Sequence, residues 1–88
     1  MKQLVTVQEV ENEGLEAFLN ENVMLFGLNY IYTGKLVGVN ITFVKLEGAK
    51  IVYETGPFNE AGYKDAQALP GKSWYVQTSA IESFGPSK

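Results

Sequence analysis

Residues 32–46 read YTGKLVGVNITFVKL, and apolar and polar side chains nearly alternate along them. Alternation with a period of two predicts half-buried β-strands, and the asparagine at the centre of residues 39–41 favours a tight turn between two of them. Gly34 and Gly38 fall inside the first strand, although glycine weakens a strand. Because a glycine within a strand commonly marks a bulge or a bend, we predict bends here and at Gly48. The alternative is that these glycines only end strands.

The sequence after this stretch also predicts β-structure. Residues 73–78 (SWYVQT) and 80–84 (AIESF) are rich in apolar and aromatic side chains, and only Ser79 separates them. One residue cannot form a hairpin loop, so we expect the chain to kink there and to pass to another part of the sheet. In chain order, the predicted strands span residues 23–30, 32–39, 42–54, 73–78 and 80–84.

A short helix is predicted over residues 12–20. Asn12 has the side chain of a helix N-cap, and acidic residues follow it in the first turn, where the helix dipole favours negative charge. Leu15, Phe18 and Leu19 are spaced three and four residues apart, so they would form one apolar stripe.

Residues 55–72 are predicted to form a long loop, because a Gly-Pro and a Pro-Gly pair bracket the segment. A loop of this length is commonly functional or mobile, and this one is either a partner-binding lid or a solvated elaboration. A short helix followed by five strongly bent strands fits a single domain over residues 1–88. The sequence therefore predicts a mainly β protein built as a small antiparallel barrel.

The amino-acid composition limits the kinds of functional site that the chain can form. The chain has no cysteine and no histidine, and all seven basic residues are lysines. Disulfides and thiolate metal sites are excluded, and the commonest general base and metal ligand are missing. We therefore expect no enzyme activity, no metal site and no cofactor. The net charge of -3 also disfavours a nucleic-acid partner, which usually meets a basic surface.

No segment predicts a membrane span or an export signal. The apolar run at residues 23–26 is far shorter than the ~20 residues that cross a bilayer, so we expect no membrane partner and a cytoplasmic protein. A domain this small, without disulfides or metals, is often stabilised by association with other chains.

The alternating stretch also carries a spaced pattern, aromatic-x-G-x-L-x-G-x-N followed by L-x-x-A. The order of a helix, this pattern, a variable loop and two strands across a kink resembles the Sm/LSm family, whose members have an N-terminal helix and five strongly bent antiparallel strands. The first Sm-like motif lies within 23–54 and the second within 73–84, and small Sm-like proteins of phage and marine metagenomic origin are the most similar. The residues that carry the first motif are Tyr32, Gly34, Leu36, Gly38, Asn40, Leu46 and Ala49.

This resemblance implies a homo-oligomeric ring, in which the fourth strand of one subunit pairs with the fifth strand of the next. The two C-terminal strands support it independently, because they would otherwise be exposed apolar edges, and a cyclic head-to-tail arrangement removes both. Rings of this family hold about five to seven subunits, and the similarity to phage-type members favours a pentamer. The expected location is the cytoplasm of a cell or of a phage-infected host. The predicted subunit interface consists of Trp74, Tyr75, Val76, Ile81 and Phe84.

The resemblance also implies contacts with single-stranded RNA. The family binds bases through an Asp, through an aromatic and an Asn of the first motif, and through an Arg-Gly step of the second. This chain has Asn in place of that Asp, and Thr-Phe and Thr-Ser in place of the Met-Asn and Arg-Gly steps. A base can still stack on the phenylalanine, but no arginine meets the phosphates. The predicted RNA-contacting residues are Asn40, Thr42, Phe43, Thr78 and Ser79.

Two functions follow from these patterns. The first is a ring-forming Sm-like protein that binds RNA weakly through its pore-side turns. The second is an assembly or interaction module that kept the ring and lost RNA binding, in which case the predicted contact residues form only a turn and a partly buried aromatic. The remaining aromatic residues belong either to a stacking platform or, more commonly, to the core and the subunit interface. They are Tyr30, Tyr32, Tyr53, Trp74 and Tyr75.

Overall fold

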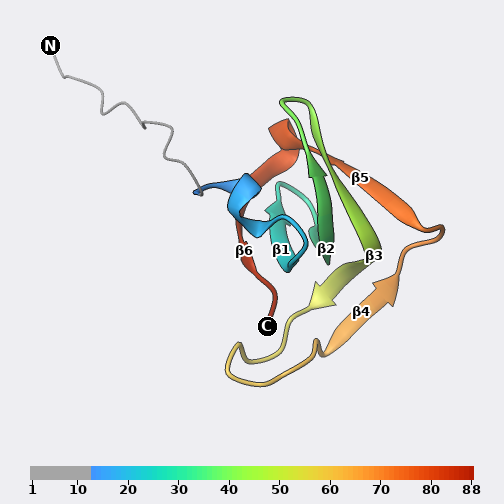
Figure 1. Ribbon diagram of the computed structural model, residues 1–88. Helices are drawn as coiled ribbons and strands as arrows, with labels where there is room; N and C mark the ends of the chain where they lie inside the picture. Colours follow the sequence, from blue (N-terminus) through green and yellow to red (C-terminus); the bar gives the residue numbers. More distant parts are fainter. Residues whose placement is uncertain (1–12) are drawn as a thin grey trace, which may run out of the picture.

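The computed structural model describes residues 13–88, and in them the protein is mainly β, as the sequence predicts (Figure 1). There are six strands and two single turns of 3-10 helix, and the described residues include no α-helix. The strands are β1 (Asn22–Gly27), β2 (Ile31–Val39), β3 (Phe43–Glu54), β4 (Asp65–Ala68), β5 (Ser73–Gln77) and β6 (Ile81–Pro86). The 3-10 turns are η1 (Leu15–Phe18) and η2 (Thr78–Ala80).

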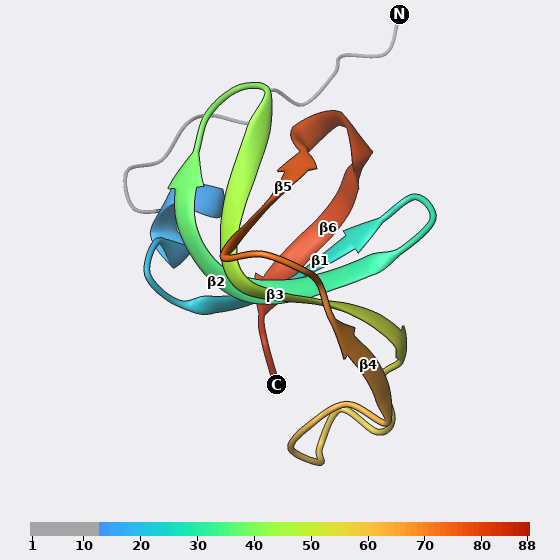
Figure 2. The same cartoon turned by 90° about the vertical axis from the view of Figure 1, so that its right-hand side faces the viewer.

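All six strands belong to one antiparallel sheet with the order β4-β3-β2-β1-β6, and β5 also pairs with β3. Strand β3 is long enough to carry both partners on one edge: its first half pairs with β5 and its second half with β4. The sheet is strongly curved, and β4 extends away from the rest of it (Figure 2). The predicted barrel is not closed by hydrogen bonds, because β5 and β6 pair with β3 and β1 and not with each other.

The predicted bends lie where β2 meets β3. The register of this pair shifts between Thr33 and Lys35 and again between Leu36 and Gly38. A Cβ atom on Gly34 would lie 3.1 Å from the Cα atom of Ala49, closer than most Cβ contacts, so glycine favours the close approach of the two backbones here. Gly48 has a φ of 59°, a left-handed conformation that is typical of glycine in β-bulges. It lies between the half of β3 that pairs with β5 and the half that pairs with β4. The bulge hypothesis is confirmed at these positions.

The predicted helix over residues 12–20 is wrong in length, because only the single turn η1 forms in the described residues. Its expected N-cap, Asn12, lies outside them. Gly14 precedes η1 with a φ of 78° and Asn20 follows it with a φ of 70°, and both values end a right-handed helix. The next backbone groups bond to β2 instead: the N–H of Asn20 donates to the carbonyl of Leu36.

The predicted loop over residues 55–72 is interrupted by β4, so its prediction as one continuous loop is wrong. The sequence DAQA of β4 contains no β-branched residue, and its pairing with the second half of β3 creates the strand. The N–H of Leu69 continues this pairing to the carbonyl of Ala49. Strand β1 is also shorter than predicted, because the N–H of Gly27 bonds to the carbonyl of Tyr30 and begins the turn to β2.

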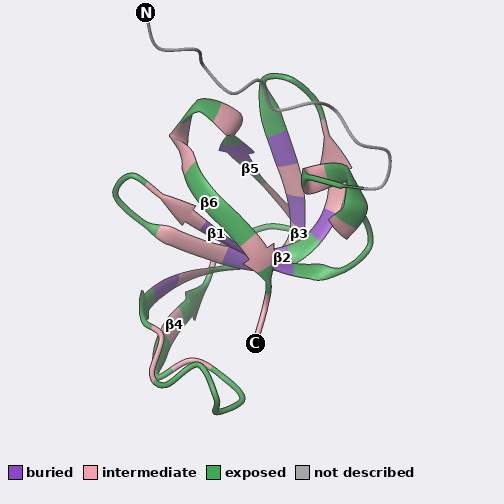
Figure 3. Cartoon of the chain, turned by 90° about the vertical axis from the view of Figure 1, so that its left-hand side faces the viewer, coloured by how far each residue is buried: buried purple, intermediate pink, exposed green. Residues whose placement is uncertain are grey.

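The core forms where buried residues of β1, β2, β3 and β5 meet, and Figure 3 shows buried segments on these strands. Burial of each large aliphatic side chain contributes about 1.5–3 kcal/mol to folding. Leu15 and Phe18 of η1 and Ile81 of β6 cover part of this cluster. The buried members are Val23, Leu25, Leu36, Val44, Leu46, Ala49 and Val76.

Candidate functional site

The turn between β2 and β3 is closed by the side chain of Asn40. Its Oδ1 atom accepts hydrogen bonds from the backbone N–H groups of Thr42, at 2.7 Å, and Phe43, at 2.8 Å. The N–H of Asn40 also donates to the carbonyl of Phe43, at 3.0 Å. This is an Asx-type turn. The sequence predicts a tight turn at this asparagine, but through a left-handed backbone conformation, which Asn40 does not adopt.

Thr78 joins this turn to η2, so the structure brings the two groups of predicted RNA-contacting residues together. The Thr78 hydroxyl donates to the carbonyl oxygens of Ile41 and Thr42, and the Thr78 N–H donates to the Thr42 carbonyl at 2.9 Å. Residues from two motifs more than thirty positions apart therefore form one surface. We call it the tip, and it consists of Asn40, Ile41, Thr42, Phe43, Tyr75, Thr78 and Ser79.

The tip exposes an aliphatic and two aromatic side chains. Ile41 is 95% exposed at the end of the turn. Phe43 is partly exposed and lies edge-to-face on Tyr75, with their ring centroids 5.2 Å apart. The ammonium group of Lys45 lies 6.0 Å from the centre of the Tyr75 ring. The tip can therefore offer aromatic faces and a lysine to a ligand, in addition to an exposed isoleucine.

Two polar side chains of the tip form hydrogen bonds within the tip itself. The side-chain Oδ1 atom of Asn40 accepts the hydrogen bonds that close the turn, and the Thr78 hydroxyl joins the turn to η2. Hydrogen bonds to bases would compete with these contacts. Lys35, which could extend a basic surface beyond Lys45, lies directly opposite Glu47 in the β2–β3 pair. The tip is therefore suited to stacking more than to base recognition by hydrogen bonds.

Strands β5 and β6 each have one strand neighbour in the described part of the chain, so each leaves one edge open. The Thr78 N–H bonds inward to Thr42, and backbone groups alternate along an antiparallel pair, so the N–H groups of Tyr75 and Gln77 face the open edge of β5. By the same reasoning, the Ser87 N–H bonds inward to Asn22 and the Phe84 N–H faces the open edge of β6.

The predicted interface residues take different positions beside these edges. Val76 is buried, so its side chain serves the core, while Trp74 and Ile81 are half-buried against the core. Tyr75 is 55% exposed. Phe84 is 39% exposed and packs edge-to-face on Phe18, with ring centroids 6.2 Å apart. The exposed apolar surface near the two edges therefore comes chiefly from Tyr75 and Phe84.

The tyrosines near the β1–β2 turn form a separate group. Tyr30 and Tyr32 lie edge-to-face with their ring centroids 6.4 Å apart, and Tyr53 is exposed on β3. Burial raises the pKa of the Tyr32 phenol, and the neighbouring Tyr30 adds to this rise. Tyr32 packs on the core, so the structure places it outside any stacking platform at the tip.

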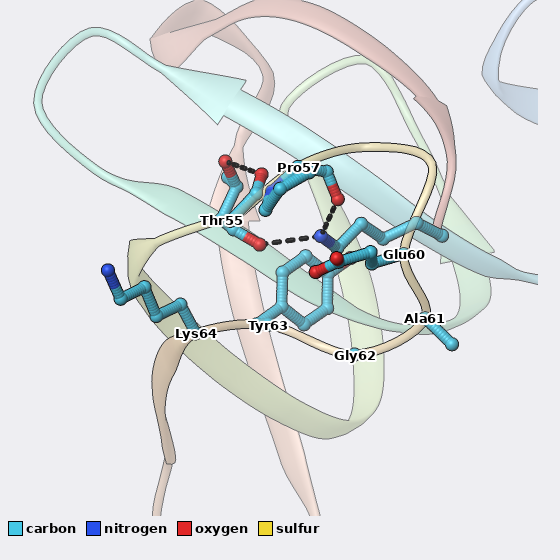
Figure 4. Close-up of a pocket in the computed structure, with 9 residues that line it drawn as sticks. Thr55, Pro57, Glu60, Ala61, Gly62, Tyr63 and Lys64 are labelled. Carbon is cyan, nitrogen blue, oxygen red and sulfur yellow. Dashed lines mark hydrogen bonds between the residues drawn. The ribbon is translucent and has the colours of Figure 1, made fainter.

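A second polar cluster lies at the loop between β3 and β4, within the segment that the sequence predicts to be either a partner-binding lid or a solvated elaboration. Part of this loop and Lys88, which the sequence assigns only to a C-terminal tail, line a hollow of about 430 Å³ (Figure 4). The loop residues that line it are Thr55, Gly56, Pro57, Glu60, Ala61, Gly62, Tyr63 and Lys64. The ammonium group of Lys88 donates to the carbonyls of Thr55 and Pro57. Phe58 and Tyr63 belong to the candidate lid that the sequence suggests, but no pattern in the sequence connects them with Lys88.

Three comparisons with known proteins are negative: no family model, no curated protein and no solved structure matches the chain. Among residues 13–88, no cluster of three or more acidic side chains has the arrangement of a metal site. No helix in the same residues is long and apolar enough to cross a membrane.

Proposed function

We propose that this protein is a ring-forming assembly module of Sm-like architecture, in which β5 of one copy pairs with β6 of the next. One observation carries the proposal: β5 and β6 follow each other in the chain across a three-residue turn, yet lie at opposite ends of the path β6-β1-β2-β3-β5, each with an open edge. An edge strand without a neighbour favours pairing with another chain.

The geometry of the two edges favours a ring over a two-fold dimer. Pairing of β5 with β6 joins two different surfaces of the subunit, and such head-to-tail contacts close into rings when the rotation between copies permits. Tyr75 and Phe84 would bring exposed aromatic surface to this contact. Pro86 has no N–H to offer, so it would end the pairing at the last residue of β6.

The strand order also supports the Sm-like part of the proposal. The last two strands lie at two ends of the sheet, and the short turn that joins them contacts the β2–β3 turn. The resemblance of the sequence to the Sm/LSm family implies this arrangement. Strand β4 is an addition within the variable loop, and it lengthens the sheet without occupying the edge of β5.

Substitution of Gln77 tests the pairing without disturbing the fold. Gln77 has a φ of -68°, which proline adopts without strain, and its N–H faces the open edge. We expect Gln77→Pro to remain folded by circular dichroism but to lose assembly in light scattering, and the matched control Gln77→Ala to assemble like the natural chain. A natural chain that scatters as a 9.7 kDa monomer at every concentration would refute the ring.

A second candidate function is weak binding of single-stranded RNA at the tip. The specific observation in its favour is the edge-to-face pair of Phe43 and Tyr75 with Lys45 beside it. Aromatic stacking contributes about 1–3 kcal/mol per base and requires no particular base. The acidic net charge opposes this function, so we place it second.

Titration of labelled oligo-U and oligo-A at roughly 50 mM and 200 mM salt separates the two functions, because phosphate contacts weaken as salt rises. RNA binding predicts salt-sensitive affinity that falls about tenfold in Phe43→Ala, while the ring persists. Phe58→Ala provides the matched control, since Phe58 is also exposed but belongs to the loop between β3 and β4. Unchanged affinity in Phe43→Ala would exclude the tip as the RNA site.

A further inference from the structure

The ammonium group of Lys88 is surrounded by groups that recognise a cation. Its Nζ atom lies 2.6 Å from the carbonyl oxygen of Thr55 and 2.7 Å from that of Pro57 (Figure 4). The ring centres of Tyr63, at 5.4 Å, and Phe58, at 5.6 Å, lie within the range of cation–π attraction. Two carbonyl acceptors and two aromatic rings therefore meet at one nitrogen.

The groups that hold this ammonium all come from one loop, whereas the lysine comes from the end of the described chain. Internal contacts shape the loop without Lys88: the Thr55 hydroxyl donates to the Gly56 carbonyl, and the Glu60 N–H donates to the Pro57 carbonyl at 3.2 Å. The Tyr63 hydroxyl is hydrogen-bonded to the Ser87 hydroxyl, at 2.6 Å, which fixes the loop to the end of β6. The cage therefore does not depend on which chain supplies the ammonium.

We propose that residues 55–63 form a binding site for a primary alkylammonium group, which Lys88 occupies from within the chain and which a lysine side chain of another protein can occupy in its place. A primary ammonium fits because it has three N–H donors for the carbonyls, which a quaternary ammonium lacks. The hollow of about 430 Å³ beside Lys88 leaves room for a second stem, and Glu60 lines it with a carboxylate. This site is independent of ring assembly.

Emptying the cage provides the test, with n-butylammonium as the probe because it reproduces the end of a lysine side chain. We expect Lys88→Ala to show saturable NMR shifts of the amides of residues 55–64 on titration with n-butylammonium chloride, and no such shifts with the neutral alcohol 1-pentanol. The natural chain should respond at least about tenfold more weakly, because the tethered Lys88 competes at a high effective concentration. An absence of saturable shifts in Lys88→Ala would overturn the proposal, as would equal responses to the amine and the alcohol.

A second substitution locates the binding within the cage. Phe58→Ala, added to Lys88→Ala, should weaken n-butylammonium binding about threefold or more, because it removes one of the two aromatic faces. Phe43→Ala at the tip is the matched control and should leave the binding unchanged. If Lys88→Ala bound n-butylammonium with the same affinity alone, with Phe58→Ala and with Phe43→Ala, the amine would bind elsewhere, which would contradict the proposal.

Lysine reactivity tests the same cage in the natural chain, and it does not require Lys88→Ala to keep the loop folded. We expect a water-soluble acylating reagent to modify Lys88 at least about tenfold more slowly than the exposed Lys72, because the caged ammonium must leave two carbonyls to react. Phe58→Ala should raise the rate at Lys88 and leave the rate at Lys72 unchanged. Equal acylation rates at the two lysines in the natural chain would overturn the proposal.

Discussion

The tip and the loop between β3 and β4 lie at opposite ends of the molecule, and they use their side chains in opposite ways (Figures 1 and 2). At the tip, the side chains of Asn40 and Thr78 are hydrogen-bonded to the backbone of the turn, and Ile41, Phe43 and Tyr75 remain exposed. At the loop, the aromatic rings of Phe58 and Tyr63 face an ammonium group, and backbone carbonyls provide its acceptors. An end that presents apolar surface is suited to stacking or protein contact, whereas an end built of acceptors and rings is suited to a cation.

Thr33→Val should produce the largest loss of stability, because Thr33 connects the loop end to the sheet. Its buried hydroxyl donates to the Val23 carbonyl at 2.8 Å and lies within hydrogen-bonding reach of Ser87 and Tyr63. Loss of these bonds at a buried site should lower the free energy of unfolding by about 1–3 kcal/mol in urea denaturation. A change below the error of the measurement would mean that the loop is not anchored through this residue.

Asn40→Ala should produce the next largest effect, at the other end of the molecule. It removes the acceptor of two backbone N–H groups, and we expect a loss of about 1 kcal/mol in the same denaturation experiment. Asn40→Asp keeps an oxygen acceptor at this position and should recover most of the stability. If the two variants were equally destabilised, the Asx turn would not explain the role of Asn40.

Thr78→Val should have a smaller and more local effect, because its bonds join two partly exposed segments. We expect a loss of about 0.5–1 kcal/mol. Hydrogen exchange should accelerate at the Thr78 amide, which bonds to the carbonyl of Thr42. Ser79→Ala is the neighbouring control and should leave this exchange rate unchanged. If exchange at the Thr78 amide were faster in Ser79→Ala but not in Thr78→Val, the Thr78 hydroxyl would not be what holds η2 to the turn.

The smallest effect should be a pH dependence from Tyr32. Burial raises the pKa of Tyr32 in the folded chain, so folding favours the protonated phenol. The resulting stability is fully present below the unfolded pKa of about 10 and is lost as the pH rises through the folded pKa. The free energy of unfolding of the natural chain should therefore fall more steeply above about pH 10 than that of Tyr32→Phe, measured in urea. If the free energies of unfolding of the two proteins changed in parallel with pH, Tyr32 would have the same pKa in the folded and unfolded chain.

Local pattern in the sequence predicts much of the sheet and the turn at the tip. Alternation around Leu36 and Leu46 identifies the core face, and the asparagine at position 40 identifies the turn, because both depend on neighbours in the chain. The close backbone approach at Gly34 follows from the rarity of glycine inside strands. The kink at Ser79 follows from the absence of room for a hairpin, and it places β5 and β6 at separate ends of the sheet.

Contacts between distant segments account for what the sequence does not predict. Strand β4 has a sequence with weak β propensity and forms through its pairing with β3. The helix over residues 12–20 is reduced to one turn because Asn20 bonds to β2. The site at Lys88 depends on two carbonyl groups that lie 33 and 31 residues before this lysine, and no periodicity connects them.

Hydrogen exchange at the open edges tests the central claim of ring assembly most directly. In a single subunit, the N–H groups of Tyr75 and Phe84 face solvent, whereas the inward-facing N–H of Val76 bonds to β3. If β5 of one copy pairs with β6 of the next, the amides of Tyr75 and Phe84 should exchange about as slowly as that of Val76 in the natural protein, and at least about 100-fold faster in Gln77→Pro. Fast exchange at both edge amides in the natural protein, at concentrations where Val76 is protected, would contradict the proposed pairing.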